Sequence, residues 1–194
     1  MKTLRLLSAF IAVFLGVSFA SCGDDEPETP PVDNNLTVNY KVTITPTEDE
    51  LKLCDLTFTY INGEGKTMSE PVAGNFEKLM SYTKFPCQGG FVLSRVKKNG
   101  AVVGEKAKMG VEYKITRVVF NSSDELLQTK TWLHNTYMTI GGDKFDDYVV
   151  KNQNIVTRSF SMAVENGNVI FTEKIAEFAI ILELNGYSGC LGIG

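Results

Sequence analysis

His134 is the only histidine of this 194-residue chain, so it is the one side chain whose ordinary pKa suits general-base catalysis near neutral pH. Nucleophilic catalysis would place Cys54, Cys87, Cys190 or a serine within hydrogen-bond reach of this imidazole. No nucleophile elbow or comparable motif surrounds any of these candidates. A solvent-facing position on a strand explains His134 better than catalysis does. We therefore predict no catalytic residue and no enzyme activity.

Three carboxylates cluster in the stretch GGDKFDDY, at Asp143, Asp146 and Asp147. Carboxylate oxygens are the ligands that Ca²⁺ prefers, but their spacing here does not match an EF-hand loop. Acidic residues at the start of a short helix explain the same pattern. The sequence predicts a helix capped by Asp143, with no metal site and no cofactor.

Trp132, Tyr137 and Tyr148 are the candidate ligand-contact residues, because aromatic ring faces suit recognition of sugars and other ligands. Trp132 shares its strand parity with the polar residues Gln128 and Lys130. In a strand, residues of one parity point to one face of the sheet. This grouping predicts Trp132 on the outer face, and packing in a core is the alternative for all three aromatic residues.

The first residues have the features of an export signal. Lys2 and Arg5 precede an uncharged apolar run over residues 6–20, and Cys22 follows Ala20 and Ser21. The run is shorter than the ~20 residues of a membrane-spanning helix. The stretch FASC resembles the bacterial lipobox, which implies cleavage after residue 21 and lipidation of Cys22. An ordinary signal peptide with a chance cysteine is the alternative.

An acidic run follows the cysteine, at Asp24, Asp25 and Glu26. It resembles the export signal of surface lipoproteins of Bacteroides-type bacteria, which implies an outer-membrane protein displayed on the cell surface. The alternative is a solvated linker facing the periplasm. Residues 22–35 contain three prolines and one aliphatic side chain, so we expect them to form a disordered linker after the signal peptide of residues 1–21.

Composition limits the partners. The chain has 19 basic and 23 acidic side chains, and removal of Lys2 and Arg5 makes it more acidic. This balance argues against nucleic acid as a partner. Cys54, Cys87 and Cys190 form an odd and widely spaced set, unlike a disulfide scaffold. Free thiols are the expectation, and one disulfide among the three is the alternative.

Alternation with a period of two begins at Leu36 and continues to Thr45, which predicts a half-buried strand. The apolar parity changes within residues 51–60, and we expect a β-bulge at Cys54 and Asp55. Further strands are predicted at 66–72, 75–83, 90–97, 111–120, 126–140, 156–164 and 169–172. Residues 173–184 fit either a helix or a strand, and the β surroundings favour a strand.

These elements predict one domain over residues 36–194: an all-β antiparallel sandwich with at most one short helix. Asn-Gly pairs between the strands suit tight hairpin turns. Residues 51–82 resemble the immunoglobulin-like β-sandwich domains of Bacteroides-type lipoproteins, a resemblance that implies fold and no activity.

The function expected from these features is that of a binding or accessory module, anchored to the membrane through lipid on Cys22. Its ligand would be an extracellular glycan or protein. A fimbrial or adhesin-type subunit is one alternative, and a hydrolase or inhibitor with an unrecognised site is another.

Overall fold

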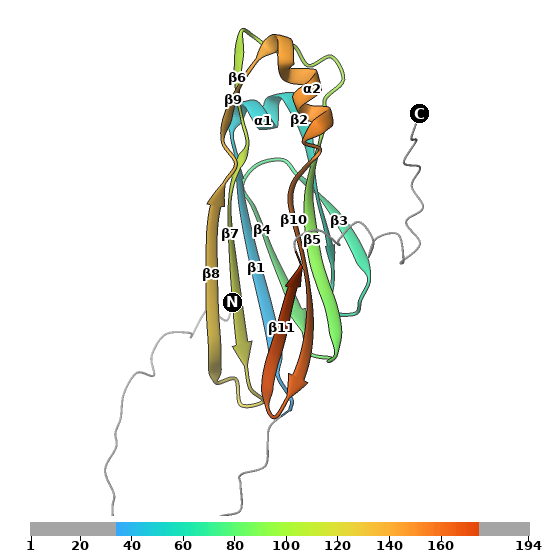
Figure 1. The fold of residues 1–194 in the computed structure, drawn as a ribbon, viewed down its shortest axis with the longest axis vertical. Helices are drawn as coiled ribbons and strands as arrows, with labels where there is room; N and C mark the ends of the chain where they lie inside the picture. Colours follow the sequence, from blue (N-terminus) through green and yellow to red (C-terminus); the bar gives the residue numbers. More distant parts are fainter. Residues whose placement is uncertain (1–33, 175–194) are drawn as a thin grey trace, which may run out of the picture. The chain divides into compact units, whose positions relative to one another are not determined.

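The computed structural model describes residues 34–174 and contains two antiparallel β-sheets packed face to face (Figure 1). The four-stranded sheet has the order β4-β1-β7-β8, and the five-stranded sheet has the order β11-β10-β5-β2-β3. A separate two-stranded sheet joins β6 and β9. The predicted all-β antiparallel sandwich is confirmed.

The four-stranded sheet contains β1 (Thr37–Pro46), β4 (Phe76–Tyr82), β7 (Val111–Phe120) and β8 (Leu126–Asn135). The five-stranded sheet contains β2 (Cys54–Ile61), β3 (Thr67–Val72), β5 (Cys87–Lys97), β10 (Asn154–Glu165) and β11 (Asn168–Lys174). The remaining elements are β6 (Lys106–Met109), β9 (Met138–Gly141), the 3₁₀ turn η1 (Gly142–Lys144) and the helices α1 (Glu48–Leu53) and α2 (Phe145–Lys151). These last elements gather at one end of the sandwich (Figure 1).

The order of the strands does not confirm an immunoglobulin-like topology. In that fold the first two strands are neighbours in one sheet. Here β1 pairs with β4 and β7, whereas β2 lies in the opposite sheet between β3 and β5.

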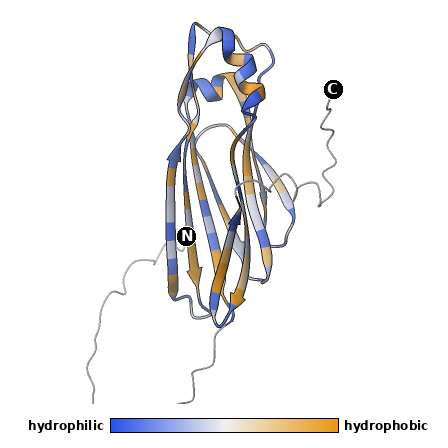
Figure 2. Ribbon diagram, in the orientation of Figure 1, coloured by the Kyte–Doolittle hydropathy of each residue, from blue (hydrophilic) through white to orange (hydrophobic). Residues whose placement is uncertain are grey.

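The core follows from the alternation of apolar and polar residues along the strands, visible as stripes in Figure 2. On β1, Val38, Tyr40 and Val42 are buried, while Asn39 and Lys41 between them are more exposed. Aromatic pairs join the two sheets. Tyr40 of β1 stacks on Phe160 of β10 with ring centroids 4.2 Å apart, and Phe58 of β2 contacts Phe76 of β4 at 5.2 Å.

The change of parity near Cys54 arises from a helix, which corrects the predicted bulge. Thr47 caps α1, its side-chain oxygen accepting a hydrogen bond from the Glu50 N–H at 3.2 Å. Leu53 is buried at the end of this helix, and β2 begins at Cys54 with an unbroken register against β5. The expectation of at most one short helix is corrected to two. Thr47 and Glu50 form the Thr-x-x-Glu signature of a helix start, which the alternation obscured.

The predicted strand over 126–140 is divided into β8 and β9. Gly110 has φ of 124°, a conformation that favours glycine, and it separates β6 from β7. On the partner strand, Thr136 donates its N–H to the Val111 carbonyl at 2.9 Å, and the chain then pairs Met138 with Met109. Both strands bend near Gly110 and Thr136, and the small β6-β9 sheet lies beyond this bend. The strand β6 was not predicted.

The other predicted strands are confirmed with small shifts at their ends, and Asn166 and Gly167 form the β10-β11 turn with positive φ angles of 51° and 72°. The helix predicted near Asp143 is also confirmed as α2. Its N-cap is Lys144, with no side-chain cap, so Asp143 lies in η1 and does not cap it. The strand predicted within residues 173–184 extends β11 to Lys174, and its remainder lies outside the described residues.

Candidate functional site

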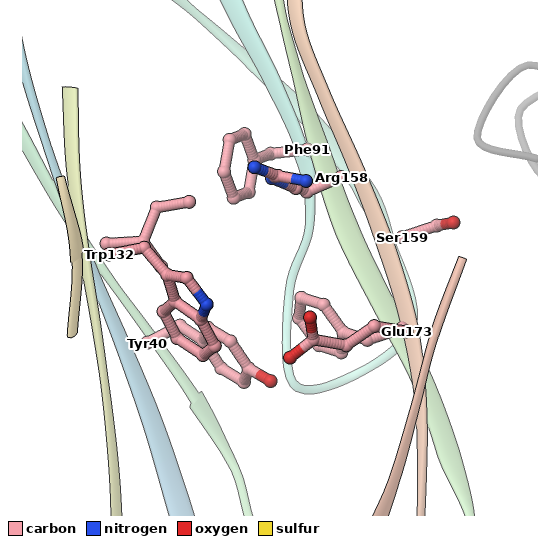
Figure 3. Close-up of a pocket in the computed structure, with 8 residues that line it drawn as sticks. Tyr40, Phe91, Trp132, Arg158, Ser159 and Glu173 are labelled. Carbon is pink, nitrogen blue, oxygen red and sulfur yellow. The ribbon is translucent and has the colours of Figure 1, made fainter. Parts of the chain in front are cut away.

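A cavity of about 250 Å³ lies between the two sheets, on the side where β8 is one edge and β11 is the other (Figure 3). It is lined by Tyr40, Phe91, Ile115, Trp132, Arg158, Ser159, Phe160 and Glu173. Its volume is slightly below the range for pockets that hold drug-sized ligands, so it has room for about one ring and its substituents.

Aromatic side chains from both sheets line the cavity. Tyr40 and Phe160 meet as a stacked pair with an angle of 7° between their rings, and Trp132 extends from β8 beside Tyr40 in Figure 3. Trp132 is opposite Ile115 of β7 in the strand register, which directs both side chains toward the space between the sheets. Tyr40 and Phe160 are buried, whereas Trp132 is half-buried and reachable from solvent.

Two charged side chains of the five-stranded sheet also line the cavity. Arg158 extends from β10 and Glu173 from β11, and Figure 3 shows the Glu173 carboxylate directed toward Tyr40. Glu173 is paired in register with Phe160, so it points to the same inner face of the sheet. Its carboxylate lies 3.5 Å from the Arg117 guanidinium of β7, which joins the two sheets across the cavity edge.

The environment of Tyr40 keeps its phenol protonated. Burial raises its pKa well above the ordinary value, and the nearby Arg117 guanidinium opposes the rise only in part. Within the described part of the chain, the Tyr40 hydroxyl has no hydrogen-bond partner of acceptable geometry. The hydroxyl is therefore a neutral, buried polar atom beside the cavity, with the Arg117 guanidinium as its nearest charged group.

Arg117 is held on several sides. It donates to the Gln128 Oε1 atom at 2.9 Å, and its guanidinium carbon lies 3.4 Å from the ring centroid of Phe171 and 5.6 Å from that of Trp132. Cation–π contacts of this kind fix the planar guanidinium and leave it little freedom. Arg117 therefore acts as a fixed positive charge beside Glu173.

The structure corrects the predicted position of Trp132. Its side chain packs against the core and lines the cavity, instead of lying on the outer face. The leucines of the opposite parity point outward: Leu127 is 49% exposed and Leu133 is 61% exposed. Trp132 remains a candidate ligand contact, now as part of a cavity wall.

Tyr137 and Tyr148, the other aromatic candidates, do not line this cavity. Tyr137 is 41% exposed between β8 and β9, with the Lys108 ammonium 5.1 Å from its ring centroid. Tyr148 lies on α2 and its hydroxyl accepts a hydrogen bond from Arg95 at 3.2 Å. Neither contact joins these residues to Trp132.

The candidate catalytic and metal-binding residues are also placed apart from the cavity. His134 is exposed on β8 and stacks on Tyr113, with ring centroids 5.4 Å apart. Cys54 and Cys87 are unpaired, and burial raises the pKa of the Cys54 thiol to about 11. Asp146 makes an ion pair with Lys97 at 2.6 Å.

Cys22, Asp24, Asp25 and Glu26 lie outside the described residues, as does Cys190. Within residues 34–174, no helix is both long and apolar enough to cross a membrane.

Sequence reasoning missed Tyr40, Arg158 and Glu173 as site residues. A signal for the last two was present, because Arg158 lies between Val156 and Phe160 at a core-facing parity and Glu173 shares its parity with Phe171. A charged residue at such a position requires a partner, a ligand or solvent.

Comparison with known proteins does not assign the chain to a family. No protein-family model matches the chain, and neither a curated protein nor a solved structure matches it.

Proposed function

We propose that this chain is a non-enzymatic binding module, anchored to the outer membrane through lipid on Cys22 and displayed on the cell surface, which binds a sugar ring of an extracellular glycan. The cavity carries the proposal. An aromatic wall containing Trp132 and Tyr40 faces the charged side chains Arg158 and Glu173, and Trp132, Arg158 and Glu173 are accessible from solvent. Apolar ring faces with a few directed polar groups are the usual composition of a ligand site.

The absence of a catalytic role is supported by the position of His134. Its imidazole stacks on Tyr113 and is not part of the cavity lining. Glu173 is the carboxylate that lines the cavity, and Arg117 holds it in an ion pair. Glycoside hydrolysis ordinarily uses two carboxylates across the scissile bond, so this arrangement favours binding over cleavage.

Isothermal titration calorimetry with a panel of plant and host polysaccharides tests the binding function. We expect saturable heat with at least one polysaccharide for the wild type and a loss of affinity of about fivefold or more for Trp132→Ala, because aromatic stacking contributes about 1 kcal/mol or more. Leu133→Ala is the matched control, since this neighbour points to the outer face. Equal affinity of Trp132→Ala and the wild type would exclude the cavity as the binding site.

Metabolic labelling with a palmitate analogue tests the anchor. We expect label on the wild type and none on Cys22→Ser. Equal labelling of both proteins would refute lipidation at Cys22.

Protease added to whole cells tests surface display. We expect it to cleave the wild type and to spare a variant in which Asp24, Asp25 and Glu26 are alanine but Cys22 still carries lipid. Unchanged cleavage of this variant would show that the acidic run does not direct export.

A further inference from the structure

Arg158 is the charged residue of the cavity that has no partner. Within the described part of the chain its guanidinium makes no ion pair and no hydrogen bond, although it is half-buried and lines the cavity. Arg117 differs, since it contacts both Glu173 and Gln128. A guanidinium that is partly removed from water and lacks an acceptor favours binding of an anion.

The other charges around the cavity also favour binding of an anion. Arg117 is offset by Glu173, which leaves the charge of Arg158 uncompensated. Lys130 of β8 adds a further positive charge, with its ammonium 4.8 Å from the ring centroid of Trp132. The edge of the sandwich where the cavity lies is therefore locally positive, although the whole chain is acidic.

The other groups select a ring that also carries hydroxyls. Glu173 presents a carboxylate, which accepts hydrogen bonds and repels a second anion placed beside it. The Tyr40 hydroxyl is buried without a partner. An anionic group directed at Arg158 and a hydroxyl directed at Glu173 would satisfy both charged residues while the ring lies against Trp132.

We propose that the cavity selects a sugar ring that carries a carboxylate, namely a hexuronate residue at the end of a glycan. The planar fork of Arg158 matches a carboxylate with two parallel hydrogen bonds, and a carboxylate occupies less of a cavity of about 250 Å³ than a sulfate ester does. This inference rests on the proposed function and adds the chemical class of the ligand.

The fluorescence of Trp132 gives a direct test, because this residue is the only tryptophan of the chain. The purified full chain is titrated with galacturonate, galactose and galactose 6-sulfate, which share one ring and differ in its charged group. We expect galacturonate to change the emission with a Kd about tenfold or more below that of galactose, and below that of the sulfate ester.

Two substitutions locate the selectivity. Arg158→Gln should reduce the preference for galacturonate over galactose to within about twofold, and Arg158→Lys should keep part of it, because it retains the charge without the fork. Lys114→Gln removes a positive charge from the exposed side of β7 and should leave the preference unchanged. Circular dichroism of each variant confirms that it is folded.

The outcomes separate this inference from the function on which it rests. Equal affinity of the wild type for galactose and galacturonate would overturn the carboxylate assignment and leave sugar binding intact. Tighter binding of the sulfate ester would replace carboxylate with sulfate. No change of emission with any of the three sugars would overturn the inference, and a negative result with the polysaccharide panel as well would also overturn the proposed function.

Discussion

Replacement of Glu50 by alanine should destabilise the fold far more than any change on its exposed neighbours. The Glu50 side chain is fully buried, and its Oε2 atom lies 3.0 Å from Nη1 of Arg95, whose own side chain is 2% exposed. The same oxygen accepts the Gly110 N–H at 2.8 Å. The ion pair thus connects α1 to β5 and to the bend between β6 and β7.

The magnitude follows from what the substitution leaves behind. Glu50→Ala leaves the Arg95 guanidinium buried without a counter-charge, and the Gly110 N–H loses its acceptor. Breaking a buried ion pair in this way costs about 3–5 kcal/mol. For a domain of this size we expect Tm to fall by about 6–20 °C.

Chemical denaturation followed by circular dichroism measures this loss. Glu48→Ala is the matched control, since Glu48 is exposed in the same turn of α1, and it should change the free energy of unfolding by less than about 0.5 kcal/mol.

A double variant separates the charge effect from simple loss of packing. Glu50 Oε1 and Arg95 Nε have no hydrogen-bond partner within the described part of the chain, so the pair is incompletely satisfied. Glu50→Leu combined with Arg95→Met should therefore cost less than Glu50→Ala alone, because it removes both charges. A loss below about 1 kcal/mol for Glu50→Ala, or a double variant as costly as the two single changes added together, would refute this reasoning.

Three further predictions concern the core, a strained turn and a surface ion pair. Phe58→Ala should cost about 3–5 kcal/mol, because Phe58 is fully buried between the sheets. Gly110→Ala should cost about 2–4 kcal/mol, since φ is 124° and a Cβ would lie 2.6 Å from the Thr136 carbonyl oxygen. The Lys78 ammonium lowers the pKa of Glu70 below its ordinary 4.5. The ion pair therefore stabilises the fold fully above pH 4.5, and this stabilisation is lost as the pH falls through the lowered pKa. Glu70→Gln should cost about 0.5 kcal/mol at pH 7 and nothing near pH 2, measured by denaturation at each pH.

Each of these has a control. Leu133→Ala, on an exposed side chain, and Gly74→Ala, where a Cβ meets nothing within 4 Å, should both stay within about 0.5 kcal/mol of the wild type. A Gly74 variant as unstable as the Gly110 variant would contradict the steric argument. For Glu70, a difference from the wild type that persists unchanged at low pH would show that the ion pair is not its cause.

The sequence by itself determined the class of the fold, because alternation is a local property of a strand. Val38, Tyr40, Val42 and Ile44 share a parity, and all four are buried in the core. The Asn166-Gly167 turn was equally predictable, since it depends on the φ angles of two adjacent residues.

The local sequence pattern did not distinguish a helix from a strand where two apolar residues are only two positions apart. Leu51 and Leu53 were assigned to a strand, although Thr47 and Glu50 form a helix start before them. The split of residues 126–140 was also hidden, because it depends on the bend at Gly110 on the neighbouring strand.

The tertiary structure alone decided which residues form the cavity. The strand β8 is an edge strand with nearly all of its side chains exposed, so its two parities differ little in polarity and do not reveal which face points inward. Trp132 points inward because it pairs in register with Ile115 of β7, whose side chain lies between the sheets. Arg158 and Glu173 join it only because β10 and β11 pack across from β8, a contact between segments distant in the sequence that no local pattern encodes.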